Sequence, residues 1–154
     1  MDNDIEAVRE ANDVFYQAFE NLDIQQMDAV WVKEDYVKCV HPGWEVRIGW
    51  QEVRDSWVLI FNNTYEIKFS VNVLDILVNG NWAWTICMEM ISTQDQGKWV
   101  DGRVVSTNLF ECRDGRWLLI HHHGSPLLTI EQKEEDRPPG RPPVGEESAL
   151  PDVI

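Results

Sequence analysis

The chain has 154 residues and a mass of 17.9 kDa, enough for one domain with a sizeable core and too few for two ordinary domains. Hydrophobic residues make up 44% and charged residues 26%, a composition that excludes a disordered or fibrous protein. The net charge is −14 and the pI is about 4.5, so nucleic acid and anionic membrane surfaces are excluded as expected partners.

The N-terminal sequence, the hydrophobic runs and the cysteines indicate the cellular compartment of the protein. No apolar run approaches the roughly 18 residues of a membrane-spanning helix. Met1 to Asp4 lack the basic start and apolar stretch of a signal peptide, so we expect a cytoplasmic protein. Cys39, Cys87 and Cys112 are widely spaced, which predicts small buried side chains rather than a disulfide framework or a thiolate zinc site.

Three helices are predicted in the first half of the chain. An amphipathic helix over about residues 3–21 follows from apolar positions at steps of three and four, together with one polar position, Asn12. Asp23, with Gln26 three residues later, resembles a capping box and starts a shorter second helix. After a short strand over residues 36–40 and a turn, a third helix is expected over about residues 50–62.

The second half of the chain has the period of strands. Asn79-Gly80 and Asp114-Gly115 are dipeptides favoured in two-residue hairpin turns. They predict a long antiparallel meander whose strands cover about residues 65–79, 81–92, 99–112 and 116–125. Helices first and strands afterwards predict an α+β fold, in which a strongly curved antiparallel sheet wraps around the N-terminal helices.

The end of the chain differs in composition. Five of the seven prolines follow Glu131, among charged residues. We therefore predict one α+β domain over residues 1–127 and a Pro-rich acidic tail over residues 128–154.

Three of the four histidines are consecutive, at the end of the last strand. Strict strand alternation would place His121 and His123 on the inner face with Leu119, and His122 on the outer face. Together with His41, two of these imidazoles could bind a transition metal; alternatively, they hydrogen-bond within a polar pocket or at a dimer face. We expect no metal, because neither a certain third ligand nor a second shell is evident.

Two strand residues are candidates for interior polar groups. Glu89 lies in mid-strand between Met88 and Met90, and a carboxylate beside apolar walls has a raised pKa and can act as a base. The alternative is an outward Glu on a solvated face. Asn108 shares a strand face with Phe110, so its amide needs a hydrogen-bonding partner or a ligand.

Aromatic residues can line a ligand pocket or simply fill the core. Candidates for pocket walls are Tyr16, Trp44 and Trp57. We expect one cavity to collect polar and aromatic side chains, with Asn108 and Glu89 deepest inside it. The residues expected to converge at its entrance are His41, Trp44, His121 and His123.

Several short segments together resemble one family, the SnoaL-like group of the nuclear transport factor two-like superfamily, over about residues 1–127. The segments are EANDVFYQAF (10–19), MDAVW (27–31), HPGW (41–44), Gly49 with Val53 and Trp57, TNLF (107–110), GRW (115–117) and HHHGSP (121–126). The resemblance implies a cone-shaped fold with a pocket at the open end and, commonly, a homodimer formed through the sheet. Members include polyketide cyclases, ketosteroid isomerases, dehydratases and noncatalytic association or transport modules, so the fold leaves the function open.

Two functions follow as alternatives. As an isomerase, cyclase or dehydratase, the protein would act on a small apolar carbonyl compound by cofactor-free proton transfer. As a binding or association module, it would hold a small apolar or aromatic ligand without turnover. The predicted catalytic residues are His123, Glu89 and His41, and the predicted substrate-binding residues are Tyr16, Trp44, Trp57, Asn108 and His121.

The outer face of the sheet predicts self-association. Leu118, Ile120 and His122 form an apolar stripe opposite the expected pocket, and Val105 and Leu109 extend it on the neighbouring strand. Such a stripe would otherwise lie in water, so we expect a homodimer through the sheet.

Overall fold

The structure is a computed structural model that describes residues 2–128. Three helices come first along the chain: α1 (Asp2–Glu20), α2 (Ile24–Val30) and α3 (Trp50–Asn62). The predicted start of α2 is confirmed, because the Asp23 carboxylate accepts hydrogen bonds from the backbone N–H groups of Gln25 and Gln26.

The described part of the chain forms one six-stranded sheet in the order β2-β1-β6-β5-β4-β3. Its strands are β1 (Lys38–Val40), β2 (Arg47–Ile48), β3 (Ile67–Asn79), β4 (Trp82–Asp95), β5 (Lys98–Arg113) and β6 (Arg116–Pro126). Strands β3 to β6 form the predicted antiparallel meander. β1 pairs with β6 in parallel and with β2 in antiparallel, and β2 was not predicted from the sequence.

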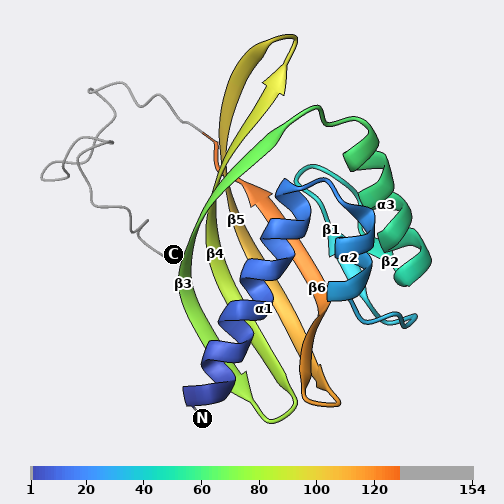
Figure 1. Ribbon diagram of the computed structural model, residues 1–154, viewed down its shortest axis with the longest axis vertical. Coiled ribbons are helices and arrows are strands. Elements are labelled where there is room, and N and C mark those ends of the chain that lie inside the picture. The colour runs from blue at the N-terminus through green and yellow to red at the C-terminus, as the bar shows by residue number, and fades with distance from the viewer. Residues whose placement is uncertain (1, 129–154) are drawn as a thin grey trace, which may run out of the picture.

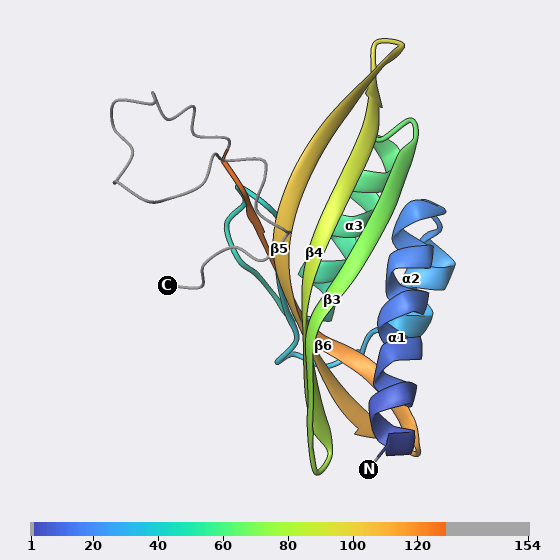
Figure 2. The ribbon, with the colours of Figure 1, turned by 90° about the vertical axis from the view of Figure 1, so that its left-hand side faces the viewer.

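All three helices lie on one side of the sheet (Figures 1 and 2). α1 runs across the meander, and α3 lies beyond α2 on the side of β1 and β2 (Figure 1). The hairpin of β4 and β5 extends past the helices at one end. The predicted α+β fold, a curved and mostly antiparallel sheet around N-terminal helices, is confirmed.

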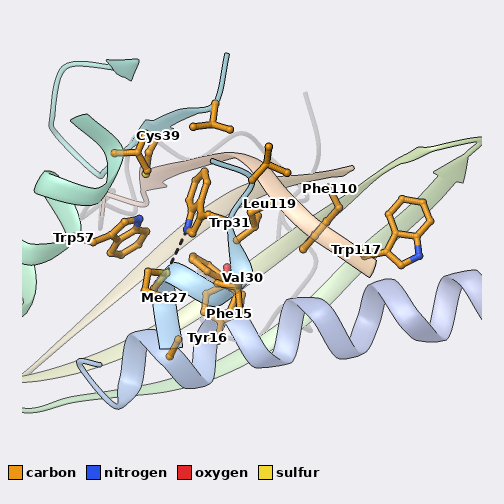
Figure 3. Packing of buried hydrophobic residues seen from close by; sticks show 14 of the residues in the cluster. Phe15, Tyr16, Met27, Val30, Trp31, Cys39, Trp57, Phe110, Trp117 and Leu119 are labelled. Carbon is orange, nitrogen blue, oxygen red and sulfur yellow. Dashed lines mark hydrogen bonds between the residues drawn. The ribbon is translucent and has the colours of Figure 1, made fainter. Parts of the chain in front are cut away.

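The core fills the space between the helices and the sheet (Figure 3). Its centre is aromatic: the Trp57 ring lies edge-on to Phe15 and Phe19, with ring centroids 5.7 and 4.8 Å apart. Trp31 Nε1 donates to the Met27 sulfur at 3.3 Å. Burying each such side chain stabilises the fold by about 2–3 kcal/mol, so the tryptophan-rich composition is explained in part by the core.

A β-bulge in β6 reverses the predicted facing of the histidines. The Cα partners of β6 on β5 skip Ile120, so the alternation of side chains shifts by one residue there. Leu119 points inward before the bulge, and His122, which is 2% exposed, points inward after it. His121 and His123 lie on the outer face instead. The prediction that these two side chains face the interior is therefore wrong.

The predicted tail begins at Leu128, and residues 129–154 lie outside the described residues. Within residues 2–128, no helix is long and apolar enough to cross a membrane.

Candidate functional site

A buried carboxylate lies between α1 and the sheet. Glu89 on β4 is 2% exposed. The Tyr16 hydroxyl, from α1, donates to Glu89 Oε2 at 2.6 Å, and Ser106 Oγ on β5 lies 2.7 Å from the same phenol oxygen. Because the phenol proton is directed to the carboxylate, the Ser106 hydroxyl donates to Tyr16. The three residues thus form a directed hydrogen-bond chain that ends on Glu89.

A second set of hydrogen bonds extends from Tyr16 toward β6. Asn108 Nδ2 donates to the Tyr16 oxygen at 3.3 Å and to Asn12 Oδ1 at 2.9 Å, and Thr85 Oγ1 donates to Asn12 Oδ1 at 2.8 Å. Asn108 Oδ1 lies 2.5 Å from His122 Nδ1. Because an amide oxygen only accepts, His122 carries its proton on Nδ1, and its Nε2 is the unprotonated nitrogen. We call Asn12, Tyr16, Thr85, Glu89, Ser106, Asn108 and His122 the polar cluster.

Burial sets the protonation of the polar cluster. Desolvation raises the pKa of Glu89, and the hydrogen bond donated by Tyr16 opposes that rise. Burial and the nearby Glu89 charge raise the pKa of Tyr16 well above its usual value, so the phenol keeps its proton. Burial also lowers the pKa of His122 well below its usual value, so this imidazole is neutral. Glu89 is therefore the member of the cluster best suited to accept a proton.

His41 forms a neighbouring polar group beneath α3. It is 2% exposed, and its Nε2 lies 2.8 Å from Ser56 Oγ, which itself donates to a backbone carbonyl of α3. His41 Nε2 is therefore the donor. The rings of Trp44 and Trp57 pack edge-on against the imidazole, at centroid distances of 5.0 and 4.6 Å. Burial, and secondly the charge of Arg47, lowers the pKa of His41 to about 4.

The structure brings together some of the predicted site residues and separates others. Tyr16, Glu89 and Asn108 belong to the polar cluster. His41, Trp44 and Trp57 form the neighbouring group, joined to the cluster through the Trp57 ring, 6.0 Å from the ring of His122.

His121 and His123 contact each other on the outer face, with ring centroids 6.0 Å apart. The predicted convergence of His41 with these two residues is therefore wrong, because His122 occupies the interior position instead. The roles predicted for His121 and His123 stay predictions, at positions outside the polar cluster. Residues 2–128 contain no group of three or more His, Cys, Asp or Glu side chains placed to hold a metal ion.

Four members of the polar cluster were not predicted as site residues. Asn12 had a signal in the sequence, because it is a polar residue in the apolar stripe of the first helix. Thr85 and Ser106 also had one, since each lies at even spacing from a predicted inward residue on its strand. His122 had no such signal. Its inward position depends on the bulge at Ile120, and the sequence of β6 does not reveal that bulge.

The chain belongs to the SnoaL-like domain family, whose family model matches residues 8–129. Members of this fold family include isomerases and dehydratases; they bind ligands and are often dimeric. F-box protein SKIP8 of Arabidopsis thaliana is 32% identical over 127 residues, which are 82% of this chain and 52% of that protein. The chain therefore spans about half the length of the curated relative that it matches.

Solved structures share the fold. A candidate dehydratase of the NTF2-like family from Streptomyces avermitilis is 36% identical with a TM-score of 0.77, over 83% of this chain and 99% of that one. A candidate calcium/calmodulin-dependent protein kinase type II association domain from Thiobacillus denitrificans is 27% identical with a TM-score of 0.70, over 77% and 93% of the two chains. A ketosteroid isomerase-like protein from Erwinia carotovora atroseptica has a TM-score of 0.70 at 15% identity, over 83% and 99%, and shows the fold alone.

Proposed function

We propose that the protein is a proton-transfer enzyme of the isomerase or dehydratase kind, acting on a small carbonyl compound with Glu89 as its base. The main support is the buried Glu89 carboxylate, whose pKa is raised by desolvation and which accepts a hydrogen bond from Tyr16. The 36% identity to a candidate dehydratase adds to this support.

The direction of the hydrogen-bond chain suggests how the two groups work together. Glu89 takes a proton from the carbon next to the substrate carbonyl, and the C–H electron pair moves toward the carbonyl oxygen. Once Glu89 is protonated, Tyr16 no longer faces an ionised acceptor, and its hydroxyl can donate to the developing enolate oxygen. Glu89 then returns the proton to another carbon in an isomerisation, or to a departing hydroxyl group in a dehydration.

Ser106 and Asn108 support the phenol in this proposal. Both donate to the Tyr16 oxygen, and they hold the ring position while its proton changes partner. Asn108 is held in turn by Asn12 and His122. Such prearranged donors lower the cost of charge development, because they need little reorganisation during the reaction.

The test is turnover by variants that keep the shape of the site. Glu89→Gln removes the base and should lower the rate of proton abstraction by about 10²–10⁴-fold. Asp75→Asn, on the outer face of the neighbouring strand β3, is the matched control because it also neutralises one carboxylate and should leave the rate unchanged. Equal rates for Glu89→Gln and the wild type would contradict the proposal.

Association through the sheet is a second proposed property. Half-buried apolar side chains lie on the outer face: Trp84, Ile86, Val105, Leu109, Leu118 and Ile120. His122, predicted to lie in this stripe, is inside, and His121 and His123 take its place on the outer face. A homodimer that covers this face is consistent with the 27% identity to a candidate kinase association domain. Such a dimer is compatible with a proton-transfer enzyme and with a noncatalytic binding or association module.

A further inference from the structure

Two buried side-chain nitrogen atoms in the described residues have no hydrogen-bond partner. Among residues 2–128, the buried side-chain nitrogen and oxygen atoms without a hydrogen-bond partner are Arg47 Nε and Trp57 Nε1. Both are donors, and a buried donor without a partner costs about 1–3 kcal/mol. Their positions therefore call for an explanation.

Both residues belong to the group around His41. The Arg47 guanidinium lies over the Trp44 ring, 5.2 Å from its centroid. Trp44 packs edge-on against His41, and His41 packs edge-on against Trp57. The two donors are thus joined by a series of contacts in which the rings of Trp44 and His41 lie between Arg47 and Trp57.

The sheet directs Arg47 to the inner side. Arg47 on β2 is the direct partner of Cys39 on β1, and partners in antiparallel strands point to the same face. Cys39 is fully buried in the core, and its own partner on β6 is the inward His122. Arg47 therefore extends the inner row of the sheet at its edge, where it is half-buried.

Arg47 has no ion-pair partner among residues 2–128, although the chain has 27 acidic residues. The nearby Glu52 carboxylate instead accepts from the backbone N–H of Ile48. A half-buried guanidinium on an aromatic ring is well suited to a planar anion, because its donors match the two oxygens of a carboxylate.

We propose that Arg47 binds the carboxylate of a small organic acid, and that Trp57 Nε1 donates to a second, uncharged oxygen of the same ligand. Because two rings separate the donors, the ligand has its oxygen functions apart from each other, as in an oxo or hydroxy acid. The half-buried Trp44 ring offers a flat apolar surface for the part between. This inference names the substrate class of the proposed function and rests on it.

The neutral state of His41 fits this ligand. With a pKa of about 4, the imidazole is uncharged at neutral pH, so Arg47 is the cation of this group. His41 Nε2 is occupied by Ser56, which leaves the two unpartnered donors to the ligand.

The experiment measures binding of 3-benzoylpropionate, its neutral amide, and 4-phenylbutyrate, which keeps the carboxylate but lacks the ketone. Titrations use the full chain at pH 7, followed by calorimetry and by the indole N–H signals in NMR spectra, with Trp57 assigned through Trp57→Phe. The wild type should bind 3-benzoylpropionate about tenfold or more tightly than either analogue. Its binding should also shift the Trp57 indole signal.

The variants separate the two contacts. Arg47→Gln should bind the acid and the amide alike, whereas Trp57→Phe should bind 3-benzoylpropionate and 4-phenylbutyrate alike. Arg9→Gln is the matched control, because Arg9 is exposed on α1 and, among residues 2–128, forms its ion pair with the neighbouring Glu6. Arg47→Lys, which keeps the charge, should bind the acid with intermediate affinity, and it serves if Arg47→Gln does not fold.

Three results would overturn the inference: no binding of 3-benzoylpropionate at millimolar concentration, equal binding of acid and amide by the wild type, or full discrimination retained by Arg47→Gln. The proposed function is scored separately, by proton abstraction from a neutral ketone in the wild type and Glu89→Gln. Abstraction without carboxylate binding contradicts only the inference, whereas carboxylate binding without abstraction contradicts only the proposed enzyme.

Discussion

The Tyr16 hydroxyl donates to Glu89 Oε2 across 2.6 Å, which joins the first helix to the middle of β4. Both side chains are buried, so this single contact links the position of α1 to the protonation of the carboxylate. A hydrogen bond to the charged form favours it, whereas burial disfavours it. Tyr16 therefore limits how far the pKa of Glu89 can rise.

Tyr16→Phe should raise the pKa of Glu89 further and lower the free energy of unfolding by about 1–3 kcal/mol. The reason is that both Glu89 and Ser106 lose a hydrogen-bond partner. Carbon-detected NMR titration of Glu89 measures the pKa, and urea denaturation measures the stability. Tyr65→Phe is the control, since Tyr65 is 82% exposed and should change neither quantity. An unchanged Glu89 pKa in Tyr16→Phe would speak against the link.

His41 should make stability depend on pH below neutrality. Its pKa falls from 6.5 to about 4 on folding, so below pH 6.5 the unfolded chain binds the extra proton. The contribution of neutral His41 to the free energy of unfolding is fully present above pH 6.5. It is lost as the pH falls toward 4, by about 3 kcal/mol in total. Urea denaturation between pH 7 and pH 4 measures this loss.

Glu89 acts in the opposite sense, because a raised carboxyl pKa makes stability fall as the pH rises through it. Wild type and His41→Gln both contain Glu89, so the difference between their pH dependences of stability cancels the effect of Glu89. His41→Gln should lose less stability on acidification than the wild type. The same pH slope in both proteins would contradict the assignment of His41.

Much of the fold could be predicted because its signals are local. The third helix was predicted over residues 50–62, where it is found, and the Asn79-Gly80 turn follows directly from hairpin chemistry. Glu89 was a candidate for the interior because it lies in mid-strand between two methionines, and the structure buries it to 2% exposure.

The histidine positions could not be predicted, because Leu118, Leu119 and Ile120 are all apolar and fit either face. A bulge at Ile120 depends on how β6 curves against β5, a tertiary property. The pairing of β2 with β1 was missed for a similar reason: two residues are too few to show a period. Arg47 therefore had no signal that placed it beside His41.

Gly124 should resist substitution, because it faces the turn after β1. A Cβ there would lie 3.0 Å from Pro42 Cγ and 3.2 Å from a methyl group of Val104. Gly124→Ala should destabilise the fold by about 1–3 kcal/mol. Gly102→Ala on β5 is the matched control, since no atom of the described residues lies within 4 Å of its Cβ position. Equal unfolding free energies for the two variants would show that the approach of Pro42 does not constrain β6.

Leu109→Lys tests the proposed dimer. Leu109 is half-buried on the outer face of β5, and a lysine there would place a charge in the covered surface. Light scattering at micromolar concentration should give the mass of a dimer for the wild type and of a monomer for Leu109→Lys. Val100→Lys, on the protruding hairpin where Val100 is 52% exposed, should remain dimeric. A monomeric wild type would remove the proposal.

The most direct test of Glu89 as a base is hydrogen–deuterium exchange at carbon. Small ketones, including 3-benzoylpropionate and neutral ketones, are incubated with the protein in D₂O, and loss of the proton signal next to the carbonyl is followed by NMR. The account predicts catalysed exchange by the wild type, a loss of about 10²–10⁴-fold in Glu89→Gln, and wild-type exchange in Asp75→Asn. Exchange at the same rate in Glu89→Gln, or at the uncatalysed rate in the wild type with every ketone, would contradict it.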